Sequence, residues 1–133
     1  MKADRPAAPS AAQKSARLVF VTYAIVLATA THWPGVVIKS DLVSRPDIFI
    51  HLAAFSLWTV LLGFTGWCGV LSSARNAVVS AAAGSTCGML DEVTQRWPIH
   101  VRVFDWADLA ANIAGGVVGG LVLLLVARRG ASV

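Results

Sequence analysis

The chain has 133 residues, of which 56% are hydrophobic and 14% are charged, and its formal net charge is +4. Soluble domains carry about 25% charged residues, and a soluble chain this apolar would expose large apolar patches and aggregate. The composition therefore excludes an ordinary soluble domain and favours a membrane protein. The basic residues stand at the edges of apolar blocks and form no basic stripe with interleaved aromatic residues, so the positive charge does not indicate nucleic-acid binding.

Residues 1–16 contain mostly Ala, Pro, Ser and charged residues, which predicts a disordered tail. The first apolar block, 18–38, is long enough to cross a bilayer core of about 30 Å at roughly 1.5 Å per residue. A basic stretch that ends at Arg17, followed by Ala28-Thr29-Ala30, is also typical of a cleavable secretory signal. The long leading tail and the later spans favour an uncleaved span that serves mainly as an anchor, and cleavage stays open as the alternative.

Three further apolar blocks predict three further spans. The second block, 48–71, is rich in aromatic residues, the third, 77–97, is built from small residues, and the fourth, 109–127, is rich in glycine. We therefore expect an all-α, polytopic membrane protein with about four transmembrane helices in a compact bundle. This transmembrane domain would cover residues 17–129.

The basic residues beside the spans predict the orientation, because cytoplasmic loops carry an excess of Lys and Arg. With the N-terminus inside, the cytoplasmic side carries Lys2, Arg5, Lys14, Arg17, Arg75, Arg128 and Arg129. The other side carries Lys39, Arg45, Arg96 and Arg102. We expect a multi-pass protein of the cytoplasmic membrane with both termini in the cytoplasm.

In this topology, three spans and one loop bring polar residues to the same depth near the outer surface. The set comprises Asp47 and His51 of the second span, Asp91, Glu92 and Gln95 of the third, Asp108 and Asn112 of the fourth, and Arg102 of the loop between the last two. Asp47 with His51, Asp91 with Gln95, and Asp108 with Asn112 are each four residues apart, a spacing that places both members of a pair on one helical face. These eight residues are the candidate ligand-binding or site-organising residues.

Each of these residues also has a purely structural interpretation. Asp47 and Asp108 stand at helix starts, where a carboxylate caps free amides, and Gln95 and Asn112 could join helices by hydrogen bonds. Asp91 is different, because it stands at the end of a span, where the helix dipole disfavours a negative charge. Its expected partners are Arg102 and His51.

Glycines four residues apart occur in the third and fourth spans, and such patterns let neighbouring helices approach closely. They are Gly84, Gly88, Gly115, Gly116, Gly119 and Gly120. The pattern predicts tight packing of the third span against the fourth, which would bring Asp91 near Asn112. Homodimerisation through the same glycine-rich face is the competing interpretation.

The stretch Asp91-Glu92-Val93-Thr94-Gln95 is followed by Arg102, by Phe104-Asp105-Trp106-Ala107-Asp108, and then by Asn112 and Gly115. Together with Asp47 and His51, this order and spacing resembles the VanZ-like family of bacterial membrane proteins, over roughly residues 45–125. The family carries Lys after the first Asp of the earlier element, whereas this chain has Ile48. The resemblance implies a four-helix bundle in the cell envelope, and no settled chemical activity comes with it.

Two classes of function follow as hypotheses. The first is a binding or modulating role, in which the outer residues hold a polar lipid headgroup or a lipid-linked cell-wall precursor. A link to glycopeptide resistance of the teicoplanin type comes from the resemblance alone, since the family is named after a component associated with it. The second is a small intramembrane hydrolase of a lipid-linked substrate that uses metal or acid–base chemistry. Because no convincing Ser or Cys nucleophile lies at the outer depth, we lean toward the non-enzymatic role and expect no cofactor and no bound metal.

Overall fold

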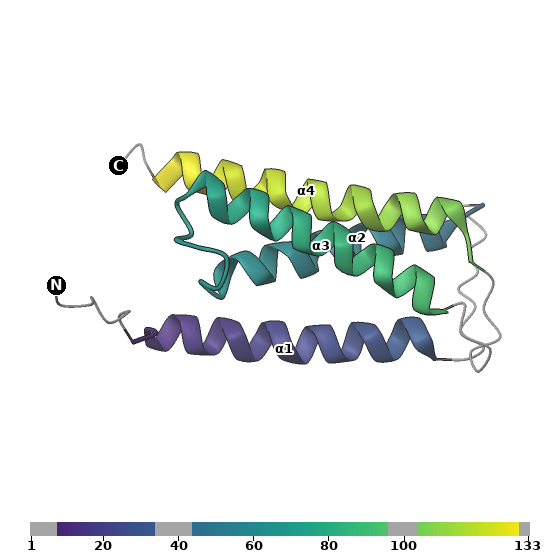
Figure 1. Ribbon diagram of the computed structural model, residues 1–133, viewed down its shortest axis with the longest axis horizontal. Coiled ribbons are helices and arrows are strands. Elements are labelled where there is room, and N and C mark those ends of the chain that lie inside the picture. Colours follow the sequence, from purple (N-terminus) through teal and green to yellow (C-terminus); the bar gives the residue numbers. More distant parts are fainter. Residues whose placement is uncertain (1–7, 34–43, 96–103, 131–133) are drawn as a thin grey trace, which may run out of the picture.

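The computed structural model describes residues 8–33, 44–95 and 104–130, which form four helices and, within these ranges, no strand (Figure 1). The helices are α1 (Ala11–His32), α2 (Pro46–Phe64), α3 (Ala74–Gln95) and α4 (Trp106–Gly130). The all-α prediction is confirmed for this part of the chain. Of the four helices, α1, α2 and α4 are long and apolar enough to cross a membrane.

Helix α1 begins earlier than the sequence patterns indicated. The Ser10 hydroxyl accepts a hydrogen bond of 3.2 Å from the Gln13 amide, and the Ser10 amide donates one of 3.0 Å to the Gln13 side chain. This reciprocal cap satisfies two amides at the helix start, and the alanines that follow favour helix. The predicted disorder of residues 1–16 is therefore wrong from Ala11 onward. The predicted end of this span, residue 38, lies outside the described residues.

Helix α2 ends before the predicted boundary at residue 71. Its last turn is closed by Thr65, whose amide and hydroxyl both donate to the Leu62 carbonyl, at 3.0 and 2.7 Å. Gly66 and Gly69 then adopt φ angles of +76° and +137°, which residues with side chains rarely adopt. The remaining residues of the predicted block, 65–71, are therefore not helical and belong to the connection to α3. Helix α4 is longer than its predicted span of 109–127 at both ends.

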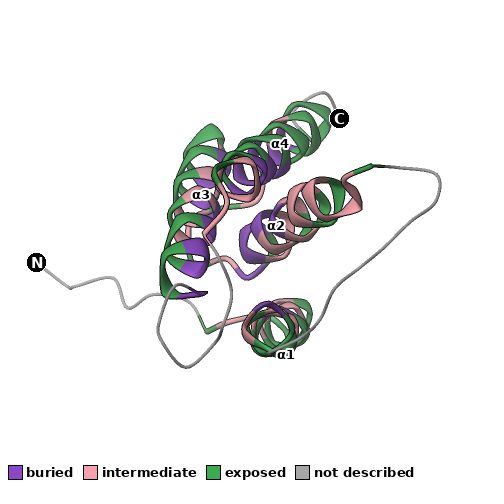
Figure 2. Cartoon of the chain, turned by 90° about the vertical axis from the view of Figure 1, so that its right-hand side faces the viewer, coloured by how far each residue is buried: buried purple, intermediate pink, exposed green. Residues whose placement is uncertain are grey.

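Helices α2, α3 and α4 pack together, and α1 lies beside them (Figures 1 and 2). The glycines of α4 allow close approach on two faces. A Cβ atom added to Gly115 or Gly119 would lie 2.6 Å from a carbonyl oxygen of α2, and one added to Gly120 would lie 2.5 Å from the Ala81 Cβ of α3. The two overlapping glycine patterns thus face different neighbours. Phe55 of α2 and Leu123 of α4 are the largest fully buried apolar side chains at this junction.

Helix α3 is inverted relative to a helix of a soluble protein. Its buried residues include Asn76, Ser80, Asp91, Glu92 and Gln95, whereas large apolar side chains stand on its exposed face. These exposed side chains are Val78, Val79, Met89, Leu90 and Val93. Polar residues lower the mean hydropathy of α3, but because these residues are buried, the exposed surface of the helix is mainly apolar and suits lipid.

The charges of the described residues separate between the two ends of the bundle. Helices α1 and α3 end, and α2 and α4 begin, at what we call the polar end, which holds Arg45, Asp47, Asp91, Glu92, Asp105 and Asp108. At the opposite, basic end, the charged residues of the described ranges are Lys14, Arg17, Arg75, Arg128 and Arg129. Among the described residues, all the acidic side chains therefore lie at the polar end, and the basic end carries only positive charge.

Candidate functional site

Arg45 ties the start of α2 to the start of α4. Its Nη2 atom donates to Asp47 and Asp105 at 2.8 Å each, and Asp108 lies 3.4 Å away. The two closer carboxylates hold the pKa of Arg45 above its ordinary range. The pKa of Asp105 is lowered, first because the Ala107 amide donates to its carboxylate at 2.7 Å and further because of Arg45. We call Arg45, Asp47, Asp105 and Asp108 the arginine cluster, and Arg45 itself remains partly exposed.

Behind the arginine cluster, His51 and Asn112 form a second layer between α2 and α4. Asn112 is fully buried, and its Nδ2 donates to the Gly88 carbonyl of α3 at 3.0 Å. Its Oδ1 therefore accepts from the His51 Nδ1, 2.9 Å away, which places a proton on that ring nitrogen. The other ring nitrogen, Nε2, faces Asp108 at 3.8 Å. Asn112 thus links three helices and orients the imidazole toward a carboxylate.

Asp91 belongs to a separate group that includes α1. Its Oδ1 accepts a hydrogen bond from the Thr31 hydroxyl at 2.7 Å, and its Oδ2 accepts one from the side-chain Nε2 of Gln95 at 2.8 Å. His32 Nδ1 lies 3.6 Å from Asp91, and His32 Nε2 lies 3.0 Å from the Thr94 hydroxyl. The expected pairing of Asp91 with His51 is wrong, because His51 is engaged by Asn112 and Asp108. The other expected partner, Arg102, lies outside the described residues.

Glu92 lies between these groups and is almost completely buried, with 1% of its surface exposed. Its Oε1 accepts a 2.9 Å hydrogen bond from the Asp105 amide, so the side chain reaches from α3 to the arginine cluster. Its Oε2 is buried and has no hydrogen-bond partner in this structure. A buried carboxyl oxygen without a donor costs free energy and calls for a structural or functional explanation.

The structure thus brings seven of the eight predicted residues to the polar end, in two groups. Asp47 and Asp108 contact Arg45, with His51 and Asn112 behind them. Asp91 accepts from Thr31 of α1 and from Gln95 of its own helix, and Glu92 lies between the two groups. The sequence reasoning missed Thr31, His32 and Arg45, and it named Asp105 in the VanZ-like stretch without including it among the eight candidates. Arg45 had been counted only as a flanking charge, although its place directly before Pro46 and Asp47 puts it at the helix start.

The arginine cluster offers more acceptors than donors. Three carboxylates share one guanidinium, and the free Oε2 of Glu92 adds another acceptor. Within the described ranges, no three His, Cys, Asp or Glu side chains are arranged to hold a metal ion. The chemistry that this arrangement suits best is the acceptance of hydrogen bonds from a polar group that carries N–H or O–H donors.

Comparison of the chain with models of protein families, with curated proteins and with solved structures gave no match in any of the three. None of the three comparisons therefore tests the resemblance to the VanZ-like family, which rests on the sequence motifs alone.

Proposed function

We propose that this protein is a VanZ-like, four-span protein of the cytoplasmic membrane, which binds a polar headgroup at its polar end. Three helices are long and apolar enough to span, and α3 is the fourth span in this proposal. The support for α3 is its inverted exposure, since Val78, Leu90 and Val93 face outward while its carboxylates are buried. Such a surface suits lipid and would be unfavourable in water.

The polar end faces the outside of the cell in this proposal. The basic end carries five Lys and Arg residues among the described residues, and an excess of these residues marks the cytoplasmic side. Both termini then lie in the cytoplasm, and the arginine cluster lies at the depth of the outer headgroups.

The observation that carries the binding proposal is the buried Oε2 of Glu92. It lacks a donor, and the Asp105 amide on the other carboxyl oxygen holds it beside the arginine cluster. Carboxylates already surround Arg45, so a bare anion would find no available positive charge in this cluster. The ligand is therefore a polar lipid headgroup or the head of a lipid-linked cell-wall precursor that presents amine or hydroxyl donors. Ile48, in place of the family's Lys, fits this absence of an anion site.

Binding of phosphatidylethanolamine tests this proposal, because its ammonium group donates hydrogen bonds that the headgroup of phosphatidylcholine lacks. In Glu92→Gln, the amide oxygen can still accept from the Asp105 amide, which leaves an NH2 group in the place of Oε2. We expect native mass spectrometry to show a preference for phosphatidylethanolamine over phosphatidylcholine in the wild type, and a loss of about tenfold in affinity in Glu92→Gln. Thr29→Val, at an exposed position on α1, is the control. Equal binding of both lipids by the wild type, or unchanged binding by Glu92→Gln, contradicts the proposal.

A hydrolase that uses acid–base chemistry is the second candidate, because His51 is oriented between Asn112 and Asp108 in the manner of a general base. It predicts release of a soluble headgroup from a lipid-linked substrate, and His51→Gln should abolish the release. If the wild type binds the lipid-linked substrate but releases no soluble headgroup, the hydrolase is excluded and only the binding role remains.

A further inference from the structure

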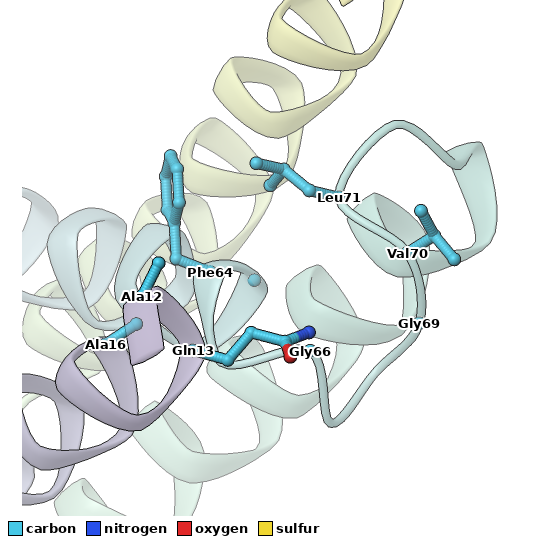
Figure 3. A pocket seen from close by; sticks show the side chains of 9 residues that line it. Ala12, Gln13, Ala16, Phe64, Gly66, Gly69, Val70 and Leu71 are labelled. Atoms are coloured by element: carbon cyan, nitrogen blue, oxygen red, sulfur yellow. The ribbon is translucent and has the colours of Figure 1, made fainter. Parts of the chain in front are cut away.

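A cavity of about 530 Å³ opens at the basic end, between the start of α1 and the connection from α2 to α3 (Figure 3). Its walls are mainly apolar and come from Ala12 and Ala16 of α1, Phe64 of α2, and Val70 and Leu71 of the connection. Gln13 supplies a polar side chain. The volume lies within the range of roughly 300–1,000 Å³ that is typical of small-molecule sites.

The cavity follows from the local sequence. The two alanines of α1 project little toward α2, and Gly66 and Gly69 contribute no side chain from the connection. A Cβ atom added to Gly66 would lie 2.6 Å from the Gln13 Nε2, so a larger residue there would enter the space that Gln13 occupies. Small residues on both sides keep the space between the two segments open.

One cationic side chain, that of Arg17, lies beside this cavity. Arg17 follows Ala16 directly, and its Nε donates to the Thr65 carbonyl at 3.1 Å, beside Gly66. Its guanidinium lies 5.6 Å from the centre of the Trp67 ring, which holds the charge in place. No acidic residue occurs among the described residues of the basic end. An apolar space with a cationic edge matches an acyl chain that is attached to an anionic headgroup.

We propose that this cavity binds one anionic phospholipid of the cytoplasmic leaflet. One acyl chain fills the space between α1 and the connection, and the phosphate lies against Arg17. The site is at the opposite end from the arginine cluster, and its ligand presents an anion instead of hydrogen-bond donors. It rests on the proposed membrane residence, and it is independent of the ligand of the polar end.

Native mass spectrometry of the full chain, released from mild detergent, tests the site with phosphatidylglycerol and with phosphatidylcholine of the same acyl chains. The wild type should retain phosphatidylglycerol in preference to phosphatidylcholine. Ala16→Leu fills the cavity and should weaken the binding of both lipids, whereas Ala28→Leu, at an exposed position on α1, should weaken neither. Arg17→Gln should weaken the binding of phosphatidylglycerol about fivefold more than that of phosphatidylcholine, the effect of one cationic side chain near an anionic headgroup. Lys14→Gln removes a cation from an exposed position on α1 and is the matched charge control.

Two outcomes overturn the proposal. One is binding of phosphatidylglycerol that Ala16→Leu leaves unchanged, and the other is a lipid preference that Arg17→Gln alters no more than Lys14→Gln does. A fall in dimer content in Ala16→Leu, without a change in lipid binding, would instead assign the cavity to a second copy of the chain. Glu92→Gln should leave phosphatidylglycerol binding unchanged. The experiment therefore distinguishes a failure of this cavity proposal from a failure of the headgroup site proposed for the polar end.

Discussion

The Thr31 hydroxyl of α1 donates a buried hydrogen bond of 2.7 Å to the Asp91 carboxyl group of α3, across 60 positions of the chain. Phe20 and Thr31 are the only buried residues of α1 within the described range, and the Tyr23 hydroxyl donates a further hydrogen bond of 3.0 Å to the Ala54 carbonyl of α2. Phe20 packs edge-on against Trp58 and Trp67, with ring centres 5.0 and 5.7 Å away. Helix α1 is therefore attached at both ends, by aromatic packing toward the basic end and by hydrogen bonds at the polar end.

Replacing Thr31 with Val keeps the shape of the side chain and removes the hydrogen bond to Asp91. We expect the free energy of unfolding to fall by about 1–2 kcal/mol, above the average of about 0.6 kcal/mol for hydrogen bonds between membrane helices, because the acceptor is a buried carboxyl group. Titration of the protein with a denaturing detergent in mixed micelles measures this change. Thr29→Val is the control, since the Thr29 hydroxyl donates to Ile25 of its own helix. Equal stability of the two variants would contradict the role given to Thr31.

Gly116→Ala should separate α3 from α4. The added Cβ atom would lie 2.5 Å from the Ser85 backbone nitrogen, and backbone atoms cannot move aside without a shift of the whole helix. We expect a loss of about 1–3 kcal/mol in the free energy of unfolding, the usual cost of overpacking. Gly130→Ala, where the added atom meets nothing within 4 Å, should change stability by less than about 0.5 kcal/mol. Similar values for the two variants in the same titration would show that the predicted close packing is absent.

Asp105 predicts a dependence of stability on acid. Its pKa is lower in the folded protein because the Ala107 amide and Arg45 stabilise the charged carboxylate. A lowered pKa adds stability above the ordinary Asp pKa of about 3.9, and this stability is lost as the pH falls through the lowered pKa. The wild type should exceed Asp105→Asn by a small, constant amount near neutral pH, because Asp105 is solvent-exposed enough for screening.

Parallel unfolding titrations of the wild type and Asp105→Asn between about pH 7 and pH 3 check this prediction, since the difference should begin to narrow as the pH falls past the ordinary Asp pKa. A difference that stays constant over this range, or that grows toward acid, would mean that Asp105 is not preferentially charged in the folded state.

The sequence predicted the four helical blocks well and their ends less well. Hydropathy reports which residues prefer lipid, so it could not show that the apolar residues after Phe64 leave the helix at Gly66 and Gly69. A Ser followed three residues later by Gln is a typical start of a helix, as Ser10 and Gln13 form here. The polar composition of residues 1–16 favoured a disordered tail instead.

Within the candidate site, spacing predicted the pairs that lie on one helix, such as Asp91 with Gln95. It could not predict Thr31 with Asp91, because that contact depends on how α1 packs sideways against the bundle. Nor could it assign His51 to Asn112 instead of Asp91, since both acceptors belong to helices that reach the polar end. Periodicity places a residue on a face, and only the packing of helices selects its partner.

In the proposed topology, α2 and α3 both cross the membrane and the polar end lies outside. Three single-cysteine variants test it, each in a background in which the other native cysteines are replaced by Ser. They carry native Cys68 in the connection from α2 to α3, Ser44→Cys before α2, and Trp106→Cys at the start of α4, where the native side chain is 75% exposed.

A thiol reagent that cannot cross membranes is applied to intact cells and to inverted membrane vesicles. We predict labelling of Ser44→Cys and Trp106→Cys in intact cells, and labelling of Cys68 only in inverted vesicles. Labelling of Cys68 from the same side as either of the other two positions would show that α2 or α3 does not cross, and the reverse pattern would place the polar end in the cytoplasm.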